Sequence, residues 1–310
     1  MNPVQPFANA VIMLLPAAFG FNAETAESNA FVRRPTDPTG VASTARREIE
    51  VMAGALVDAG VHVELWQDTP TPPRPDAPFV NNWLSTHRDG RVFIYPMATP
   101  SRRAEIRRDL IASLRDRFQV SEVVDWSHEA AAGRALEGTG SLVIDTPDRR
   151  RVFACRSPRT DANLAAAWAA THNLELVLFG AQDLSNAAIY HTNVLLSLAA
   201  GISLCGLSQI PTRERHTVAA ALHERGPVIE LTAEQLDAFA GNMLQLVNRN
   251  GSPLLVLSTT ALAALLPAQR RSLERQSALL PVAIPTVEAV GGGSARCLLA
   301  EIFLPAQAPS

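Results

Sequence analysis

The stretch at residues 141–179, SLVIDTPDRRRVFACRSPRTDANLAAAWAATHNLELVLF, decides the fold. Two short apolar runs, 141–145 and 151–155, are separated by a polar turn rich in arginine and proline. A helical segment follows at 160–172, and a third apolar run follows at 174–179. Short apolar runs bounded by turn residues are typical of buried strands, and the longer alanine-rich run is typical of a helix. The stretch therefore predicts a strand–strand–helix–strand unit.

The same order of elements recurs along the rest of the chain. Apolar runs predict strands at residues 11–15, 61–66, 92–95, 141–145, 151–155, 174–179, 228–231, 254–258 and 297–304. Helical spacing predicts helices at about residues 42–59, 102–118, 160–172, 212–224, 232–248 and 259–278. Thr232 and Gln235 form a capping-box pattern at the start of one of them. The units recur about every 55–65 residues without repeating residue identities, which favours a cyclic α/β architecture.

Composition indicates a folded protein with no overall basic field. The chain has 310 residues, of which 47% are hydrophobic, and its net charge is −3. We expect a single domain over residues 1–310, and neither nucleic acid nor a membrane as partner. The arginines at 149–151 are interpreted as a solvated turn rather than a phosphate site.

The cysteines and the first apolar run indicate in which cellular compartment the protein is expected. Cys155, Cys205 and Cys297 are too few, and odd in number, for a disulfide framework, so we expect a reducing, cytoplasmic location. The run at 11–15 has no basic region before it and ends at Pro16, so we interpret it as a core strand rather than a signal peptide. No run of about 18 apolar residues lacks a charge or a breaker, so no membrane span is expected. A homodimer is expected only from the frequency of symmetric dimers.

The segment Glu288-Ala289-Val290-Gly291-Gly292-Gly293-Ser294-Ala295-Arg296-Cys297 is the first candidate for chemistry. Its three glycines allow a sharp turn and a close approach of backbone to a ligand. A thiol needs an electropositive setting to become a thiolate, and Arg296 with the backbone N–H groups offers one. A glycine-rich hairpin with a buried structural cysteine explains this segment equally well.

Three further segments carry polar residues next to predicted strands. In 189–194, His191 and Asn193 are two residues apart, so an extended chain would place both on one face. In 136–142, Glu137 precedes a glycine turn and a strand. In 79–83, Asn81 and Asn82 follow a proline-rich loop at 69–78, interpreted as a stiff surface loop. Taken singly, each is explained by a structural histidine or an ordinary turn.

A cysteine, a histidine and a glutamate beside strand ends fit nucleophilic catalysis at an sp² carbon. The thiolate attacks, the imidazole moves protons and the carboxylate orients or accepts hydrogen bonds. The chain has no Cys-x-x-Cys and no His-x-x-x-His pair, so a metal site is a poor competitor. We expect neither a metal nor an organic cofactor.

Taken together, these segments resemble the guanidino-group modifying enzymes of the pentein superfamily. That group includes arginine deiminase, dimethylarginine dimethylaminohydrolase and the amidinotransferases, and the resemblance is closest to the arginine deiminase-related hydrolases of citrulline utilisation. It runs from about Pro16 to Glu301 and rests on the order and spacing of the stretches 81–83, 95–97, 136–140, 190–194 and 291–297. It implies an α/β fold, a five-fold pseudosymmetric α/β propeller built of ββαβ units, with the active site in its central channel.

The resemblance also implies roles for individual residues. Cys297 is expected to be the nucleophile, His191 the general acid/base and Glu137 the carboxylate beside the substrate. The family grips the amino-acid end of its substrate with two arginines, and Arg102 and Arg159 fall on those positions. A bidentate contact between guanidinium and carboxylate is the physical reason for arginine there.

Other residues are assigned to the substrate site with less support from the pattern. Asn81 and Gly292 are expected to contact the substrate. Asn29 and the segment 19–24 are further candidates for the lining, although caps and turns explain them equally well.

Two departures from the family pattern bear on the substrate. Guanidine-hydrolysing members hold the cationic group with aspartates at positions that are Asn82 and Asn193 here, and the last residue of a Glu-Gly-Gly-Asp segment is Gly140 here. An asparagine cannot neutralise a buried guanidinium, but it offers both a donor and an acceptor to a neutral ureido group. We therefore expect a small amino-acid substrate, citrulline, hydrolysed to ornithine, ammonia and carbon dioxide through a covalent cysteine adduct.

Several alternatives stay open at this point. Arginine or a methylated arginine is the first, with Glu137 alone opposing the cation. Amidino transfer shares the covalent step with hydrolysis. A non-catalytic pentein that acts as a binding module is less favoured, because the thiol, the histidine and the carboxylate are all present.

Overall fold

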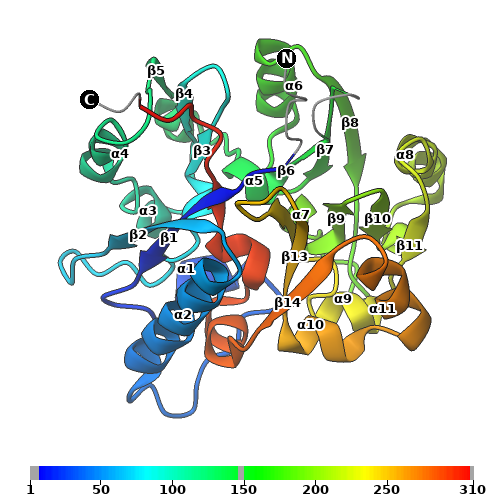
Figure 1. The fold of residues 1–310 in the computed structure, drawn as a ribbon, viewed down its shortest axis with the longest axis horizontal. Helices are drawn as coiled ribbons and strands as arrows, with labels where there is room; N and C mark the ends of the chain where they lie inside the picture. Colours follow the sequence, from blue (N-terminus) through cyan, green and yellow to red (C-terminus); the bar gives the residue numbers. More distant parts are fainter. Residues whose placement is uncertain (1–6, 146–149, 308–310) are drawn as a thin grey trace.

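Five small three-stranded sheets form the frame of the molecule (Figure 1). The computed structural model describes residues 7–145 and 150–307. The sheets are β15–β1–β2 (Ala300–Glu301, Ala10–Leu15, His62–Gln67), β3–β4–β5 (Leu84–Thr86, Arg91–Ile94, Glu122–Asp125), β6–β7–β8 (Leu142–Asp145, Arg151–Arg156, Glu175–Gly180), β9–β10–β11 (Leu196–Ala199, Ile202–Cys205, Val228–Glu230) and β12–β13–β14 (Leu244–Val247, Pro253–Ser258, Ala278–Val282). This arrangement confirms the predicted α/β propeller of ββαβ units.

Every sheet is connected in the same way. Its first strand pairs antiparallel with its second, and the second pairs parallel with the third, as in Leu142↔Ala154 and Arg151↔Glu175. A parallel pair needs a crossover, and a helical segment supplies it in each unit. In the first unit β15 takes the place of a preceding strand and pairs antiparallel with β1. The two ends of the described chain therefore close the ring on one sheet.

The longer helices lie outside the ring of strands, whereas α5 and α7 are short turns at its centre (Figure 1). In chain order the helices are α1 (Ala23–Ala26), α2 (Val41–Asp58), α3 (Pro100–Arg103), α4 (Arg108–Leu114), α5 (Gly138–Ser141), α6 (Ala162–Thr171), α7 (Thr192–Leu195), α8 (Thr212–His223), α9 (Ala233–Asp237), α10 (Thr259–Ala264) and α11 (Pro267–Glu274). Single turns of other helix types occur at Val80–Asn82 (η1), Ser127–Ala132 (η2), Leu207–Gln209 (η3), Val287–Gly291 (η4) and Ala295–Leu298 (η5).

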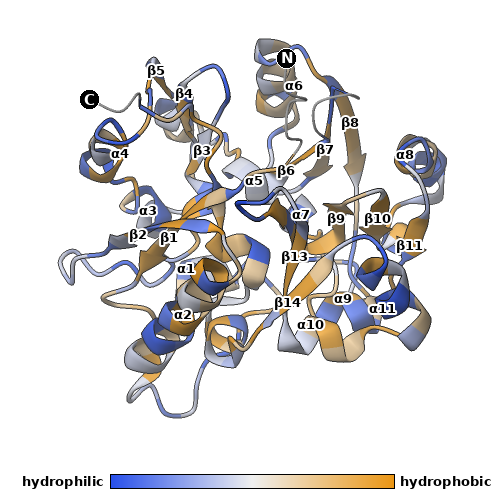
Figure 2. Cartoon of the chain, viewed as in Figure 1, coloured by the Kyte–Doolittle hydropathy of each residue, from blue (hydrophilic) through white to orange (hydrophobic). Residues whose placement is uncertain are grey.

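Burial follows hydropathy in this arrangement. Helix α2 buries Ile49, Met52 and Leu56, which recur at helical spacing, against β1 and the C-terminal segment. Strand β1 is buried on both faces, as expected for a strand between two others near the centre. Figure 2 shows the strands as largely hydrophobic, while α2, α8 and α11 carry hydrophilic residues on their outer sides.

Some predicted elements are wrong in detail. The helix expected at 102–118 is interrupted between α3 and α4, where Glu105 turns inward to bond Arg102. The helix expected at 232–248 ends at Asp237, after a capping box of Thr232 and Gln235 that is confirmed. The chain then turns at Phe239, which has φ +59°, and continues as β12, which pairs with β13.

Two further predictions need correction. The helix expected at 259–278 divides into α10 and α11 at Pro267, because proline cannot continue a helix from the preceding turn. The strand expected at 297–304 is reduced to β15, because Cys297 itself lies in the helical turn η5. Of the arginine run at 149–151, Arg149 lies outside the described residues.

No helix in residues 7–145 and 150–307 is long and apolar enough to cross a membrane.

Candidate active site

The predicted site residues lie in equivalent places in the repeated units. Asn82 ends the turn η1, shortly before β3. Glu137 precedes α5 and β6, and His191 precedes α7 and β9. Cys297 lies in η5, shortly before β15. Each first strand starts next to the centre of the ring, so residues just before these strands meet there although they are far apart in sequence (Figure 1).

A small enclosed cavity marks the meeting point. It is lined by Thr25, Asn29, Asp76, Phe79, Asn82, Arg102, Arg159, Tyr190, His191, Gly291, Gly292, Gly293 and Cys297. Its room is about 10 Å³, which is about what one water molecule needs. An amino acid therefore enters only if part of the wall moves. Arg159 donates to the carbonyl of Thr25 (2.9 Å) and to Oγ of Ser28 (2.8 Å), so these contacts with the segment around α1 hold the wall closed.

Cys297 is surrounded by amides. Its Sγ accepts from Nδ2 of Asn242 at 3.3 Å and from Nδ2 of Asn193 at 3.6 Å. Burial raises the pKa of the Cys297 thiol above its ordinary value, and the contacts with Ser294, Asn242, Arg296 and Asn193 oppose this only in part. Cys297 is therefore a thiol at rest, and attack by its sulfur would require a base to take the proton.

His191 brings an imidazole to the wall of this cavity. Its Nε2 lies 2.9 Å from Oε2 of Glu137, and both side chains are almost completely buried. Burial lowers the pKa of His191 to about 4, although Glu137 acts in the opposite direction. The imidazole is therefore neutral at pH 7. Since an ionised carboxylate only accepts, Nε2 carries the proton and Nδ1 is left as the basic nitrogen.

Glu137 lies behind His191 rather than on the cavity wall. Its Oε1 accepts from the backbone N–H of Ala98 at 3.0 Å, and Oε2 lies 3.5 Å from Arg102 and 3.6 Å from Arg159. Burial by itself would raise the pKa of Glu137, but Arg159, His191 and Arg102 together hold it well below its usual range. The carboxylate is therefore ionised, and it is positioned to orient His191 and to stabilise its protonated form.

The two predicted arginines differ in their partners. Arg102 is fully buried and pairs with Glu105 at 2.9 Å, and its Nη1 donates to Oδ1 of Asn82 at 2.7 Å. Burial raises the pKa of Glu105 to about 7 even though Arg102 opposes the rise. Among the described residues, Arg159 bonds to neutral polar groups, lies over the ring of Tyr190 at 4.9 Å and is 3.6 Å from Glu137. Both line the cavity, so both remain candidates for binding a substrate carboxylate.

Some of the predicted asparagine and glycine residues line the cavity, and others lie behind its wall. Asn82 and Gly292 line the cavity, whereas Asn81 is completely buried beside it and accepts from Asn82 Nδ2 at 3.0 Å. Gly292 has φ +64°, and its carbonyl accepts from Tyr190 Oη at 2.7 Å and from Asn29 at 3.0 Å. Asn193 contacts Cys297, and it does so from the turn α7 and not from a strand as expected.

Sequence reasoning missed two residues of this site. Asn242 precedes β12 and completes the five equivalent positions, a place that the repeat could have indicated if β12 had been recognised. Asp76 was placed in a surface loop, but only 69–73 of that loop is exposed. Asp76 is 2% exposed and lines the cavity, where its Oδ2 accepts from Asn22 and Thr25.

Gly140 has a steric role that the sequence comparison could not reveal. A Cβ there would lie 2.5 Å from Nδ2 of Asn82 and 2.8 Å from Nδ1 and Cε1 of His191. We expect Gly140→Ala to lower kcat/KM about a hundredfold or more, because it displaces the base, and to cost about 1–3 kcal/mol of stability.

Gly54→Ala is the matched control for this prediction. Nothing lies within 4 Å of a Cβ at this position in α2, so alanine should raise the stability by about 0.5–1 kcal/mol and leave kcat/KM unchanged. Urea unfolding and steady-state kinetics measure both effects. Unchanged kinetics in Gly140→Ala would show that His191 and Asn82 tolerate displacement.

The buried histidine predicts a pH dependence of stability. The folded pKa of His191, about 4, lies below the unfolded value of about 6.5, so the unfolded chain binds the extra proton first. Stability contributed by neutral His191 is complete above pH 6.5 and is lost as the pH falls towards 4. Between pH 7.5 and 5 the free energy of unfolding should fall by about 2 kcal/mol more in the wild type than in His191→Asn. Equal slopes in the two proteins, measured by urea unfolding, would contradict the burial of a neutral imidazole.

The described residues contain no group of three or more His, Cys, Asp or Glu side chains arranged to hold a metal ion.

Comparison with known proteins places the chain in a family. A sequence profile described as N,N dimethylarginine dimethylhydrolase, eukaryotic, matches residues 15–304, nearly the whole chain. The chain belongs to this family. This match confirms the predicted resemblance to the guanidino-group modifying penteins. It also confirms the prediction that the chain is a hydrolase. No curated protein sequence matches the chain.

Solved structures share the fold of this family member. Unliganded ArgZ, an arginine dihydrolase from the ornithine–ammonia cycle in cyanobacteria, matches with a TM-score of 0.73 and 14% identity over 96% of this chain and 41% of that chain. The substrate-bound N-terminal domain of ArgZ matches with a TM-score of 0.74 and 15% identity over 96% and 98% of the two chains. DDAH from Pseudomonas aeruginosa, a mutant complexed with citrulline, matches with a TM-score of 0.66 and 16% identity over 96% and 100%. This chain thus spans less than half of full-length ArgZ, and the likeness establishes the propeller fold.

Proposed function

We propose that this chain is a cysteine hydrolase that converts citrulline to ornithine, ammonia and carbon dioxide. The observation that carries the proposal is the setting of Cys297 Sγ, whose side-chain hydrogen-bond partners are the amides of Asn193 and Asn242. Amides offer donors and acceptors to a neutral ureido group, but they do not neutralise a guanidinium. Glu137 is already engaged by His191, Arg102 and Arg159.

The charged residues on the cavity wall suit the amino-acid part of the substrate. Arg102 and Arg159 supply positive charge for an α-carboxylate, and Asp76 supplies a buried carboxylate for an α-ammonium group. Arg159 is the better placed of the two arginines, because its present partners, a carbonyl and a hydroxyl, are neutral and belong to the segment around α1. A substrate carboxylate can replace them as that segment moves.

The reaction follows from the protonation states of the free site. As the thiol of Cys297 attacks the ureido carbon, Nδ1 of His191 takes its proton, and Glu137 stabilises the imidazolium. The imidazolium then gives this proton to the departing δ-nitrogen, so that ornithine leaves and a carbamoyl thioester remains. Water attacks the thioester with His191 as base, which releases carbamate and regenerates the thiol. Carbamate decomposes to ammonia and carbon dioxide.

Arginine is the second candidate substrate. It is favoured by Asp76, a carboxylate on the wall of the cavity, which could face a guanidinium instead of an ammonium group. Two of the structural neighbours are also described as an arginine dihydrolase. With arginine, the same cysteine chemistry would release ammonia first and give citrulline as product or intermediate.

Purified protein incubated separately with citrulline and with arginine tests the proposal. Ornithine, citrulline and ammonia are quantified, and Cys297→Ser is the control for contaminating activity. Formation of ornithine and ammonia from citrulline, without turnover of arginine, would support the proposal. Turnover of arginine without turnover of citrulline would overturn it in favour of the second candidate.

The substitution Asn193→Asp tests whether the amides beside Cys297 favour citrulline over arginine. A carboxylate next to Cys297 should oppose thiolate formation and attract a cation, so the ratio of kcat/KM for citrulline to that for arginine should fall about tenfold or more. Asn193→Ser, which removes the amide without adding charge, is the matched comparison. A ratio that falls equally in both variants would show that charge does not set the preference.

The proposal also covers the binding partner and the cellular location of the protein. A small amino acid is the partner, and the three cysteines are free and buried, as suits a reducing cytoplasm. The single domain and the homodimer remain predictions.

A further inference from the structure

Arg102 lines the candidate active site, but both edges of its guanidinium group are already occupied. On one edge, Nε donates to the two carboxylate oxygens of Glu105 at 3.0 and 3.2 Å, and Nη2 donates to one of them at 2.9 Å. On the other edge, Nη1 donates to Oδ1 of Asn82 at 2.7 Å, and Nη2 donates to the carbonyl of Phe79 at 3.4 Å. A bidentate contact with a substrate carboxylate needs two neighbouring N–H groups on one edge. Arg102 can make that contact only by giving up partners within the protein.

Arg159 has partners that a substrate can replace at lower cost. Its Nε and Nη2 share Oγ of Ser28 at 3.1 and 2.8 Å, and Nη2 also donates to the carbonyl of Thr25 at 2.9 Å. These acceptors are neutral, so a carboxylate would form a stronger, charge-assisted bond to the same N–H groups. Arg102 would have to release Glu105, a carboxylate that is almost completely buried with it. These contacts favour Arg159 as the residue that binds a substrate carboxylate.

The contact with Arg102 fixes the orientation of the Asn82 amide. A guanidinium group only donates, so the Asn82 atom that lies 2.7 Å from Nη1 of Arg102 is the amide oxygen Oδ1. The other amide atom is therefore Nδ2, and it donates to Oδ1 of Asn81 at 3.0 Å. A flipped amide would place donor against donor at Arg102 and acceptor against acceptor at Asn81, which leaves buried polar groups unsatisfied.

The second N–H of Asn82 Nδ2 remains for a ligand. Within residues 7–145 and 150–307, Nδ2 makes one hydrogen bond, the bond to Asn81, and Asn82 is part of the wall of the small cavity. A Cβ on Gly140 would lie 2.5 Å from Nδ2 of Asn82 and 2.8 Å from Nδ1 of His191, so these two nitrogens flank the same small space. The remaining donor of Asn82 therefore lies beside the nitrogen that acts as base in the proposed reaction.

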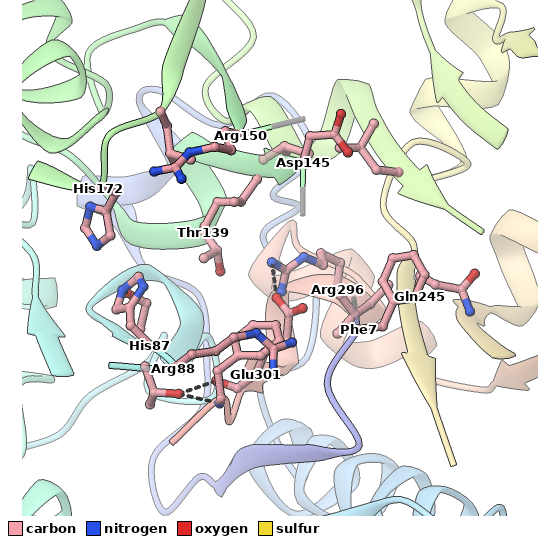
Figure 3. Close-up of a pocket in the computed structure, with 18 of the residues that line it drawn as sticks. Phe7, His87, Arg88, Thr139, Asp145, Arg150, His172, Gln245, Arg296 and Glu301 are labelled. Atoms are coloured by element: carbon pink, nitrogen blue, oxygen red, sulfur yellow. Dashed lines mark hydrogen bonds and ion pairs between the residues drawn. The ribbon is translucent and has the colours of Figure 1, made fainter. Parts of the chain in front are cut away.

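Further hydrogen bonds support Asn82 from behind the cavity. Nδ2 of Asn81 donates to Oγ1 of Thr139 at 3.3 Å, and Oγ1 of Thr139 donates to the carbonyl of Asn81 at 3.4 Å. Thr139 also lies on the wall of a separate cavity of about 610 Å³, none of whose described lining residues borders the small cavity at Cys297 (Figure 3). The hydrogen bonds that hold Asn82 therefore extend from the small cavity to the large one.

We infer that Arg102 is a positioning residue, which makes Asn82 a fixed hydrogen-bond donor to the carbonyl oxygen of a ureido substrate. The inference rests on the proposed function and explains how the site prefers citrulline to arginine. A ureido group has a carbonyl oxygen that accepts, whereas a guanidinium group has only donors. A guanidinium group in the same place would face the N–H of Asn82 donor against donor, which is costly in a buried site.

Steady-state kinetics of Arg102→Lys tests the inference, with Arg159→Lys as the matched control. Selectivity is the ratio of Ki for arginine, added as a competitor, to KM for citrulline. Lysine keeps the charge but cannot hold Glu105 and Asn82 at the same time as a guanidinium fork does, so the amide can turn and the ratio should fall about tenfold or more. Arg159→Lys should raise both constants and leave the ratio within about threefold, because citrulline and arginine carry the same α-carboxylate.

A substrate without the α-carboxylate, N-carbamoyl-1,4-diaminobutane, separates the two arginines further. Its kcat/KM relative to citrulline should be as low in Arg102→Lys as in the wild type, and this difference should become much smaller in Arg159→Lys. An unchanged selectivity ratio in Arg102→Lys would overturn the inference. A smaller difference between the two substrates in Arg102→Lys would overturn it as well, because Arg102 would then be binding the carboxylate.

Asn82→Asp decides the matter if Arg102→Lys does not fold. Aspartate keeps the acceptor for Arg102 but replaces the donor with a second acceptor. Asn81→Asp is the matched control, because it adds the same charge one residue away and keeps the acceptor for Nδ2 of Asn82. The selectivity ratio should fall at least about tenfold further in Asn82→Asp than in Asn81→Asp.

The outcomes distinguish this inference from the proposed function. A wild type that does not hydrolyse citrulline would overturn the proposed function and the inference with it. Citrulline hydrolysis by the wild type, together with equal falls of the ratio in Asn82→Asp and Asn81→Asp, would overturn the inference alone.

Discussion

Replacement of Cys297 by serine is expected to lower kcat/KM by about four orders of magnitude or more while leaving the fold intact. The site is built for a thiol. Two asparagine amides approach Sγ at 3.3 and 3.6 Å, and the proposed base, His191, is a neutral imidazole whose pKa is about 4. Such a base can accept a proton from a thiol in a concerted attack, but a serine hydroxyl is far less acidic and would remain unreactive.

The other two cysteines provide the control. Cys155 and Cys205 are completely buried in the hydrophobic core, and burial raises the pKa of Cys155 to about 12. Cys155→Ala should cost some stability but keep kcat/KM within a factor of about three, as expected for a residue outside the site. Steady-state kinetics and a thermal melt of each variant measure the two effects. Activity that survives in Cys297→Ser and not in Cys155→Ala would move the nucleophile to another position.

Substitution of Glu137 by glutamine is expected to reduce both activity and stability. The carboxylate touches His191 at 2.9 Å and lies near Arg102 and Arg159 in a region without water access. Glutamine has the same shape, but it neither stabilises the imidazolium nor balances the two buried guanidinium groups. We expect kcat to fall about a thousandfold or more and the free energy of unfolding to fall by about 3 kcal/mol, since an uncompensated buried charge is costly.

Glu50→Gln is the control for Glu137→Gln, because it removes a carboxylate from the surface and not from the candidate site. Glu50 pairs with Arg46 on the exposed side of α2, and such pairs contribute at most about 0.5 kcal/mol. Its replacement should therefore change neither kinetics nor stability measurably. If Glu137→Gln keeps kcat within tenfold of the wild type, the carboxylate does not serve His191 in catalysis, and the proton transfer needs another partner.

Local pattern predicted most of the fold. The strands at 11–15, 151–155 and 174–179 are apolar runs bounded by turn residues, and each lies within one or two residues of its observed place. The segment at 232–248 failed because its apolar residues fit a helix as well as a strand, and only the pairing of β12 with β13 decides between them. Cys297 was placed in a strand for the same reason, because a buried helical turn and a buried strand have similar composition.

The residue types of the candidate site were also recognisable from the order of the motifs. Cys297, His191 and Glu137 were candidates because a thiol, an imidazole and a carboxylate occur beside predicted strand ends, and Arg102 and Arg159 were named through the resemblance to the guanidino-group modifying enzymes; their roles stay predictions. The sequence did not indicate Asp76, because a proline-rich loop is normally exposed, nor Asn242, because the preceding helix was drawn through it.

Distances, protonation states and the closed wall required the tertiary structure. Glu137 and His191 are 54 residues apart, and nothing in the local pattern states that their side chains meet at 2.9 Å. The pKa of His191 depends on burial and on charges contributed by two other units, so no local rule can supply it. A short sequence pattern determines which element forms and which face is apolar. The meeting of turns from five units determines the chemistry, because burial and charge at one point are sums over the whole fold.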